Sequence, residues 1–197
     1  SGNFGNAYSA WFGRSNGLSI NQIFCSTNVN DVLRRFIDGG VLEPLVTQPS
    51  VAPSMDIQIP SSLERLIFDL STEAKEFYAQ LQNSTKAQLG EKSVDALKSV
   101  FSSVTFSDEM IKTRITSLHD EFGIIFDPHT VTSVQMALDN DSSLPTVAVA
   151  TASPEKFGNV ISPLINGFTE SKIDQKEQYL TLSTENAAII EAIKAFI

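Results

Sequence analysis

Two glycines near the start of the chain, in the segment Gly2-Asn3-Phe4-Gly5-Asn6, have the spacing of a loop that could bind an anion. Glycine lets backbone amides approach a ligand closely, because it has no side chain to hold the ligand away. An apolar-periodic stretch typical of a helix follows, and the first N–H groups of a helix are unpaired and lie at its positive dipole end. The sequence therefore predicts a phosphate cradle that needs no lysine or arginine. A simple turn is the alternative for so short a loop.

A second candidate anion site lies at the predicted start of a later helix. Ser61 and Ser62 would bring two hydroxyls to the uncovered amides there, and Arg65 follows one turn further on. Hydroxyls together with a guanidinium suit a phosphate group. The alternative is an N-capped helix on which Glu64 and Arg65 are merely solvated.

Two further segments follow predicted strands, where ligand sites of α/β proteins lie. In Asp127-Pro128-His129-Thr130 the histidine could be a general acid or base, or a cap and hydrogen-bonding residue of the core, which we favour. The hydroxyl of Thr151 could reach a ligand, although a turn after a strand is the alternative. His119 has no acidic or cysteine partner at ligand spacing, so neither histidine supports a metal site and we predict none.

Composition excludes several classes of protein. The net charge is −9, with 42% hydrophobic and 19% charged residues, which is typical of a globular domain and argues against a nucleic-acid or anionic-lipid partner. No stretch approaches the roughly 20 apolar residues of a membrane-spanning helix. The single cysteine, Cys25, cannot form an internal disulfide and is predicted to be a small buried strand residue. We expect a soluble, cytoplasmic protein.

The elements that position these residues alternate between helix and strand. We predict helices at Ala7–Asn16, Asn28–Phe36 (capped by Asn28 or Asn30), Leu63–Leu70 (capped by Ser61 or Ser62), Ser107–Phe122, Thr130–Leu138 and Ser183–Ile197, and strands at Ile20–Cys25, Ile124–Phe126 and Pro145–Ala150, the last of them buried. Residues 72–101 have polar helical periodicity and are interpreted as a helical excursion. The pattern indicates an α/β fold: a mainly parallel twisted sheet with helices on both faces and a ligand site at the carboxyl ends of its strands.

Five segments in order resemble threonine synthases of the bacterial and fungal branch over nearly the whole chain. They are GNFGN at 2–6, TNVNDVLRRF at 27–36, PSMDIQIPSSLERL at 53–66, DPHT at 127–130 and TASPEKF at 151–157. The resemblance implies a fold type II pyridoxal-phosphate enzyme, similar to the tryptophan synthase β chain. Such an enzyme is a lyase of threonine biosynthesis that converts O-phospho-L-homoserine and water into L-threonine and phosphate.

The resemblance also implies roles for the candidate residues. The cofactor phosphate would be held by Gly2, Asn3, Phe4, Gly5 and Asn6. Thr151 would face the pyridine nitrogen as a neutral partner, which leaves that nitrogen unprotonated and weakens the cofactor as an electron sink. Ser61, Ser62 and Arg65 are candidates for the substrate phosphate. The chain has Ser1, Asn6, Ser62 and Ser153 where the family usually has threonine, aspartate, asparagine and histidine.

The family's Schiff-base lysine, its serine- and glycine-rich substrate-carboxylate segment and its amino-terminal domain lie upstream of its glycine loop. We therefore expect residues 1–197 to be the carboxy-terminal part of a catalytic domain, with the upstream domain absent and the missing amino-terminal half as its partner. No catalytic residue is assigned within the chain, and the isolated chain is expected to be inactive. A threonine-synthase-like phospholyase and a noncatalytic phosphate- or metabolite-binding module are the alternatives.

Overall fold

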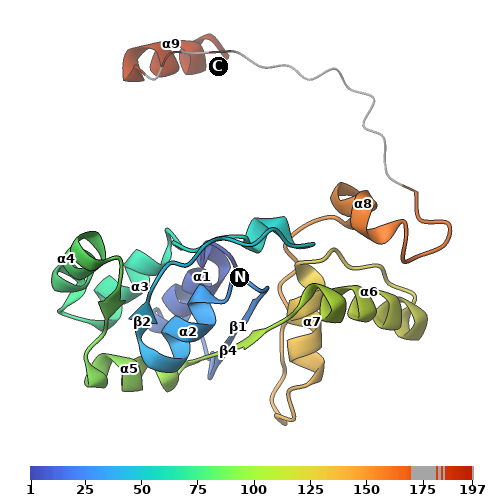
Figure 1. Cartoon of the computed structure of the whole chain (residues 1–197), viewed down its shortest axis with the longest axis horizontal. Coiled ribbons are helices and arrows are strands. Elements are labelled where there is room, and N and C mark those ends of the chain that lie inside the picture. Colours follow the sequence, from blue (N-terminus) through green and yellow to red (C-terminus); the bar gives the residue numbers. More distant parts are fainter. Residues whose placement is uncertain (170–180, 182, 184, 197) are drawn as a thin grey trace.

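The computed structural model describes residues 1–169, 181, 183 and 185–196. Its elements in chain order (Figure 1) are α1 (Gly5–Ser15), β1 (Ile23–Thr27), α2 (Val32–Gly39), β2 (Val41–Leu42), the short 3₁₀ helix η1 (Pro53–Met55), α3 (Leu63–Leu70), α4 (Ala74–Ser84), β3 (Ala87–Gln88), α5 (Glu91–Lys98), β4 (Phe101–Thr105), α6 (Asp108–Phe122), α7 (Thr130–Leu138), the 3₁₀ helix η2 (Pro154–Phe157), α8 (Gly158–Ile161) and α9 (Asn186–Phe196). This alternation confirms the α/β class.

The two longer strands form a parallel pair. β1 and β4 run in register from Ile23 opposite Phe101 to Thr27 opposite Thr105, and Figure 1 shows them between α1 and α2 on one side and α6 and α7 on the other. A separate short pair, β2 and β3, is antiparallel. Parallel strands need a crossover between them, and here the crossover contains the segment from α2 to α5.

Helices cover both faces of the β1–β4 pair, as the sequence predicts. Side chains alternate between the two faces of a strand. Ile23 and Cys25 belong to a buried cluster with residues of α1 and α2, whereas Phe24 packs against a second cluster built from α6, α7 and α8. On that second face the hydroxyl of Ser26 is 2.7 Å from that of Thr132 on α7. Cys25 is 1% exposed, which confirms its predicted place in a buried strand.

Local signals located several helices well. α1 ends where Asn16-Gly17 was predicted to end it, with Gly17 at φ 99°. The Ser107 hydroxyl accepts the Met110 amide and so caps α6, and Gly123 ends that helix in the left-handed conformation. The bounds of α7 match the predicted helix. Two helices, α4 and α5, lie within the predicted excursion 72–101.

Two predicted strands are wrong. Residues 124–126 form no strand, and the segment 145–150, predicted to be a buried strand, has no regular secondary structure and is exposed, with Val147 84% exposed. An apolar run becomes a strand only when another strand bonds to its backbone, and no strand in the described part of the chain lies beside either segment. β1 begins three residues later than predicted and extends to Thr27, whereas β2, β3 and β4 were not predicted.

The predicted caps of two helices are also corrected. Asp31 precedes α2 and no side chain caps that helix, because Asn28 and Asn30 bond to a later loop instead. Ser62 precedes α3 without a side-chain hydrogen bond to it. Its hydroxyl is therefore available to another partner.

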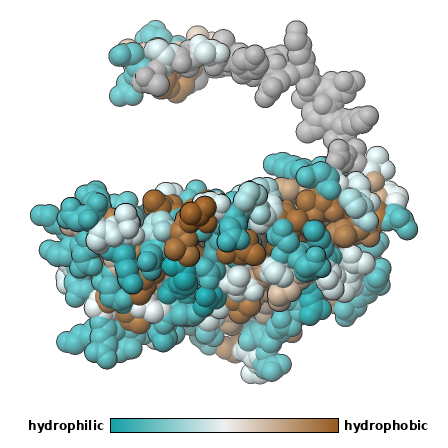
Figure 2. Space-filling model, viewed as in Figure 1, coloured by the Kyte–Doolittle hydropathy of each residue, from teal (hydrophilic) through white to brown (hydrophobic). Residues whose placement is uncertain are grey.

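The terminal helix α9 is present where an amphipathic helix was predicted, although Ile197 lies outside the described residues. In Figure 1 it lies apart from the other elements, and its Ile190 and Ile193 are about half exposed. Figure 2 shows hydrophobic areas there and in several separate places between hydrophilic ones. Within the described residues, no helix has the length and apolarity to cross a membrane.

Candidate functional site

The glycine loop presents a row of uncovered amides. α1 begins at Gly5, and the backbone N–H groups of residues 3–7 donate no hydrogen bond to any other described residue. The side chains of Asn3 and Asn6 are exposed, and α1 has no acidic residue in its first turn. Such a helix start combines unpaired donors with a positive dipole end, so it attracts an anion.

Phe4 anchors this loop from below. Its ring is completely buried and lies 5.7 Å from that of Phe101 on β4, centroid to centroid. The residue has φ 67° and ψ 8°, a left-handed conformation that costs a non-glycine residue on the order of 1–2 kcal/mol. Burying an aromatic side chain contributes about 1.5–3 kcal/mol, enough to offset that cost. The buried ring therefore holds the backbone in the turn that exposes the amides.

The two glycines of the loop are needed for different reasons. A Cβ atom on Gly2 would lie 2.4 Å from the carbonyl oxygen of Ser54 and 3.2 Å from the Cα of Met55, so the loop packs directly on the backbone of η1. A Cβ atom on Gly5 would meet only the Ser62 Oγ, at 3.9 Å, and would project into the space between the two segments. Gly2 thus permits close packing, whereas Gly5 leaves room in front of the amides.

The structure brings the second candidate segment to the glycine loop. The Ser62 amide donates to the carbonyl of Asn3 (3.0 Å), and the Ser61 amide donates to the side-chain oxygen of the same residue (3.3 Å). Ser62 is 8% exposed, and its hydroxyl makes no hydrogen bond within the described residues. The starts of α1 and α3 therefore converge, and a hydroxyl near Gly5 is left without a partner.

Arg65 lies on the side of this site. Its guanidinium carbon is 5.3 Å from the centroid of the Tyr8 ring, the geometry of a cation–π contact. The hydroxyl of Tyr8 and the indole N–H of Trp11 both donate to Asp69 on α3, at 3.3 and 3.2 Å. These contacts join α1 to α3, with the guanidinium of Arg65 over the ring of Tyr8.

His129 has the structural role that the sequence favoured. Its Nδ1 is 2.8 Å from Asp127 Oδ1, and its Nε2 is 3.0 Å from the backbone nitrogen of Ser54. Asp127 is completely buried and also accepts the amides of His129 and Thr130. Burial raises the pKa of the Asp127 carboxyl, but its hydrogen bonds with His129 and Thr130 outweigh this, and the pKa lies below its ordinary value. The carboxylate therefore stays ionised and orients the ring.

Thr151 lies at the end of the same hydrogen-bonded series. Its amide donates to the hydroxyl of Thr130 at 3.0 Å, and the two hydroxyls are 3.4 Å apart. Thr130 in turn donates its amide to Asp127. Thr151 itself is exposed, so its hydroxyl is accessible to a ligand. Contacts therefore connect the segment that bears Thr151 with the loop that bears Gly2.

A polar network that the sequence did not reveal holds the loop of residues 48–58 against the end of β1. Asn28, completely buried, donates to Asp56 (2.6 Å) and to Ser50 (2.7 Å), and its side-chain oxygen accepts the Asn30 amide. Asn30 also donates to Asp56, at 3.0 Å. Runs of asparagine and aspartate usually indicate caps or turns. Only the fold brings these residues together, and η1 with Ser54 is placed by them.

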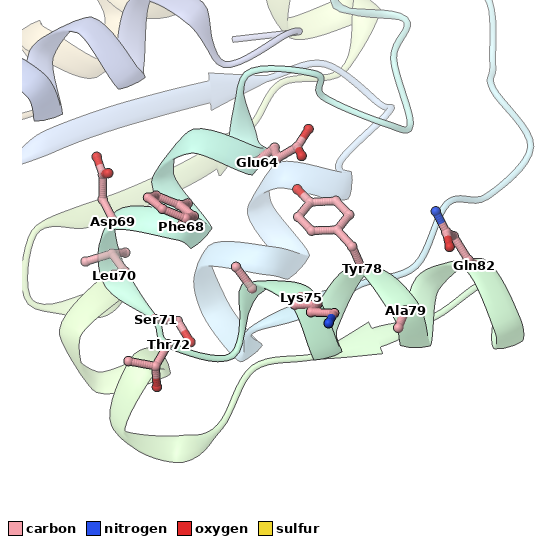
Figure 3. Close-up of a pocket in the computed structure, with 11 residues that line it drawn as sticks. Glu64, Phe68, Asp69, Leu70, Ser71, Thr72, Lys75, Tyr78, Ala79 and Gln82 are labelled. Carbon is pink, nitrogen blue, oxygen red and sulfur yellow. The ribbon is translucent and has the colours of Figure 1, made fainter.

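A hollow of about 890 Å³ lies elsewhere, between α3 and α4 (Figure 3). Figure 3 shows the polar ends of Glu64 and Tyr78 pointing toward one another across it. Burial, and then the charge of Glu64, raises the pKa of Tyr78. The lining contains no residue of the glycine loop and neither Ser61 nor Ser62. The hollow is therefore not the candidate anion site, because the converging hydrogen-bond donors lie at the start of α1.

The donor set suits a phosphate-bearing group rather than a metal. The uncovered amides, the free Ser62 hydroxyl and a loop packed so closely that a Cβ on Gly2 would clash form a cradle for an anion. In the described ranges, no group of three or more histidine, cysteine, aspartate or glutamate residues could hold a metal ion. Pyridoxal phosphate would fit with its phosphate on residues 2–6 at the start of α1.

Comparisons with known proteins agree with one another. The chain is 31% identical to the threonine synthase of Pseudomonas aeruginosa over 202 residues, covering 95% of this chain and 43% of that protein. It is 28% identical to that of Saccharomyces cerevisiae over 210 residues, with 93% and 41% covered. Among solved structures, the PLP-bound threonine synthase from Brucella melitensis has a TM-score of 0.83 at 28% identity, over 99% of this chain and 44% of that one. No family model matches.

The parallel α/β scaffold is that of the fold type II pyridoxal-phosphate enzymes. Within that class the chain belongs to the threonine synthase family, and it matches the carboxy-terminal half of the family's members. The chain spans less than half the length of the curated relatives reported above.

Proposed function

We propose that this chain is the part of a threonine synthase that binds the cofactor phosphate. The whole enzyme would convert O-phospho-L-homoserine and water into L-threonine and phosphate with pyridoxal phosphate, in the cytoplasm. The names of the relatives and the PLP-bound structure from Brucella melitensis support this proposal. The observation that carries it is the row of uncovered amides over residues 3–7, because an anion is the ligand such a row binds.

Each candidate residue then has a task in binding or orientation. The amides of residues 2–6 would hold the cofactor phosphate, and the Thr151 hydroxyl would lie against the pyridine nitrogen as a neutral partner. Pyridoxal phosphate, when bound, supplies an electron sink for the substrate's bonds. Ser61, Ser62 and Arg65 would hold the substrate phosphate. The convergence of α1 and α3 supports this, since it places the Ser62 hydroxyl next to the first anion site.

The remaining part of the enzyme would supply the Schiff-base lysine and the rest of the substrate site. Such a lysine needs an unprotonated amine in a desolvated cleft. The lysines of the described residues do not meet this condition, because all are exposed except half-buried Lys112: Lys75, Lys86, Lys92, Lys98, Lys112, Lys156 and Lys194. We therefore expect the isolated chain to bind phosphate groups and to be inactive.

Binding by the chain alone can be measured with pyridoxine 5′-phosphate, which lacks the aldehyde and binds only noncovalently. The backbone ¹H–¹⁵N signals of residues 2–7 should shift with this compound and with inorganic phosphate, and not with unphosphorylated pyridoxine. If both phosphates instead shift signals around the α3–α4 hollow, or shift none, the assignment of the glycine loop is wrong.

The second candidate function is that of a threonine-synthase-like phospholyase. The protein named threonine synthase-like 1 of Macaca fascicularis is 29% identical over 206 residues, covering 98% of this chain and 28% of that protein. A related phospholyase would bind its cofactor phosphate in the same way and release another product. Full-length enzyme incubated with O-phosphohomoserine distinguishes the two: threonine and phosphate in equal amounts support the synthase, whereas phosphate without threonine supports the phospholyase.

A further inference from the structure

Hydrogen bonds and packing connect His129 both to the glycine loop, through Ser54, and to the segment that bears Thr151, through Asp127 and Thr130. His129 is 6% exposed, its ring lies 4.7 Å from that of Phe157 on η2, and it precedes the first residue of α7. Both ring nitrogens are engaged by protein groups, Nδ1 by Asp127 and Nε2 by the Ser54 backbone nitrogen. What it contacts is Ser54, on whose backbone Gly2 is packed.

The partners of the ring define its protonation state. The Ser54 backbone nitrogen can only donate, so the His129 Nε2 that lies 3.0 Å away must accept and carries no proton. The ionised Asp127 carboxylate can only accept, so the Nδ1 that lies 2.8 Å away carries the ring proton. The arrangement requires a neutral imidazole with its proton on Nδ1. A second proton would place a donor on Nε2 opposite the donor of Ser54.

The position of Ser54 is in turn transmitted to the anion site by close packing. The Ser54 carbonyl oxygen lies where a Cβ atom of Gly2 would be only 2.4 Å away. Protein interiors are close-packed, so a displacement of η1 moves the backbone that rests on it. The segment that would move is the start of the row of uncovered amides.

We infer that His129 is a positioning residue for the glycine loop, and that its protonation switches the loop from an anion-binding to a weakly binding arrangement. In the neutral state the Ser54–His129 hydrogen bond fixes η1 beneath Gly2, and the amides keep their common direction. Protonation breaks that bond, η1 moves away from the ring, and the amides lose their alignment. This inference rests on the proposed anion-binding role of the loop.

Besides the ring, the Ser1 ammonium contacts Met55 on η1, and burial lowers its pKa. The His129→Gln variant keeps this amine and so separates its effect from that of the ring. Asp127, from the ring's own segment, is the charged group in ion-pair distance within the described residues. From η1 the ring receives the Ser54 amide, and from η2 it contacts the apolar Phe157. Glu155 and Lys156 on η2 are exposed and form no ion pair with His129.

The carboxylate of Asp56, which follows η1, accepts hydrogen bonds from Asn28, Asn30 and Ser50 and not from the His129 ring.

The test follows sulfate binding by the chain with ¹⁵N spectra between pH 8 and pH 5.5 at constant ionic strength. Sulfate stays doubly charged over this range, so its own titration does not contribute. The imidazole signals of His129 and His119, the two histidines of the chain, are followed in the same samples. His129→Gln places a nontitrating amide oxygen within reach of the Ser54 amide, and His119→Gln is the matched control on α6.

Sulfate affinity of the unmodified chain should fall roughly tenfold as His129 is protonated, which corresponds to a loss of about one hydrogen bond's free energy. His129→Gln should bind with little dependence on pH, and His119→Gln should keep the full dependence. Constant affinity between pH 8 and pH 5.5, or an unchanged pH profile in His129→Gln, would overturn the inference.

The same spectra without sulfate test the inference independently of anion binding. The amide signals of Ser54, Gly2 and Asn3 should shift between pH 8 and pH 5.5, and these shifts should be reduced in His129→Gln but not in His119→Gln. If they do not move, His129 does not position the loop, whether or not the loop binds anions. If they do move but no anion binds at any pH, the proposed function fails while the mechanical coupling holds.

Discussion

The glycine loop and the segment of residues 144–151 form the two halves of the candidate site, and they are held very differently. The loop is held by the burial of its own Phe4 ring and by three other parts of the chain: the backbone of Ser54, the amides of Ser61 and Ser62, and, through His129, the start of α7. The second segment is exposed throughout and is held by hydrogen bonds with Thr130, Ser133 and Asn140.

This difference shows which part of the site the chain forms by itself. An anion site must be rigid before the ligand arrives, because aligned donors bind without a cost of ordering. The loop satisfies this condition with contacts inside the described chain. Under the proposed function, Thr151 would face a cofactor ring, and the rest of the enzyme would supply the second wall that defines its direction.

Gly2→Ala should have the largest effect of any single change at the site. The new Cβ would lie 2.4 Å from a backbone oxygen that cannot rotate away, so the loop or η1 must move. We expect a loss of about 1–3 kcal/mol in the free energy of unfolding and a loss of phosphate affinity of roughly tenfold or more. Urea denaturation and ¹⁵N titration measure the two effects.

Gly39→Ala is the matched control, because the nearest atom to its Cβ would be 4.0 Å away and the residue ends a helix in an ordinary conformation. It should leave phosphate affinity unchanged. Full affinity in Gly2→Ala would mean that the loop adjusts freely, and the contrast between the two halves of the site would disappear.

Asn28→Ala should come next, through stability alone. It removes the donors to Ser50 and Asp56 and leaves the buried Asn30 amide without its acceptor. Losing such partners costs about 1–3 kcal/mol for a buried group. Denaturation midpoints should show this, with the exposed Asn83→Ala as a control that changes little. Equal stability of the two variants would show that the 48–58 loop does not depend on the network.

Alkaline pH tests the burial of β1, on which the loop rests. Burial raises the pKa of the Cys25 thiol from 9.0 to about 12. The folded state therefore keeps the thiol proton of Cys25 between pH 9 and 12, whereas the unfolded state loses it. The stabilisation from the buried thiol is complete below pH 9 and decreases progressively as the pH rises to 12. Stability should fall by up to about 1.4 kcal/mol per pH unit in that window.

Burial also raises the pKa of Tyr78, so the ionisation of this tyrosine in the unfolded state lowers the stability at alkaline pH as well. Cys25→Ala separates the contribution of the thiol from that of Tyr78. Its stability should fall less steeply above pH 9 than that of the unmodified chain, as measured by urea denaturation at a series of pH values. Parallel curves for the two proteins would mean that the thiol is not buried in solution.

Ser62→Ala should weaken anion binding with little change in stability. Its hydroxyl bonds to nothing in the described chain but lies near Gly5. Its removal would therefore break a hydrogen bond to a bound anion and none within the described chain. A net hydrogen bond of about 1 kcal/mol predicts an affinity loss of roughly fivefold. Ser93→Ala on α5 is the control. If phosphate affinity is unchanged in Ser62→Ala, the phosphate at the loop does not reach α3.

Sequence patterns located the parts of the fold that depend on local signals. The capping hydroxyl of Ser107 and the terminal Gly123 define α6 without help from distant residues, and the bounds of α7 were predicted in the same way. The glycine loop was located because glycine spacing and a following helix are local features. The packing of Gly2 on Ser54 could not be predicted, since it joins residues far apart in the chain.

Errors arose where tertiary partners decide the structure. Asn28 was assigned to a helix cap because asparagine favours that position, but its side-chain oxygen accepts the Asn30 amide and its side-chain nitrogen donates to Asp56. The strand β4 was missed because residues 101–105 follow a helical stretch and acquire strand structure by pairing with β1. The opposite error at 145–150 has the same cause, since no described strand pairs with it.

Thr151→Val should have the smallest effect, and it measures the loosely held half of the site. Valine keeps the shape of threonine, and the backbone bond to Thr130 remains, so the free energy of unfolding should change by less than about 0.5 kcal/mol. Thr130→Val, at a residue 2% exposed, removes the hydroxyl that accepts the Thr151 amide and should cost about 1–2 kcal/mol. Urea denaturation of the two variants side by side makes the comparison. Equal, large losses would show that residues 144–151 are packed in solution as firmly as the glycine loop.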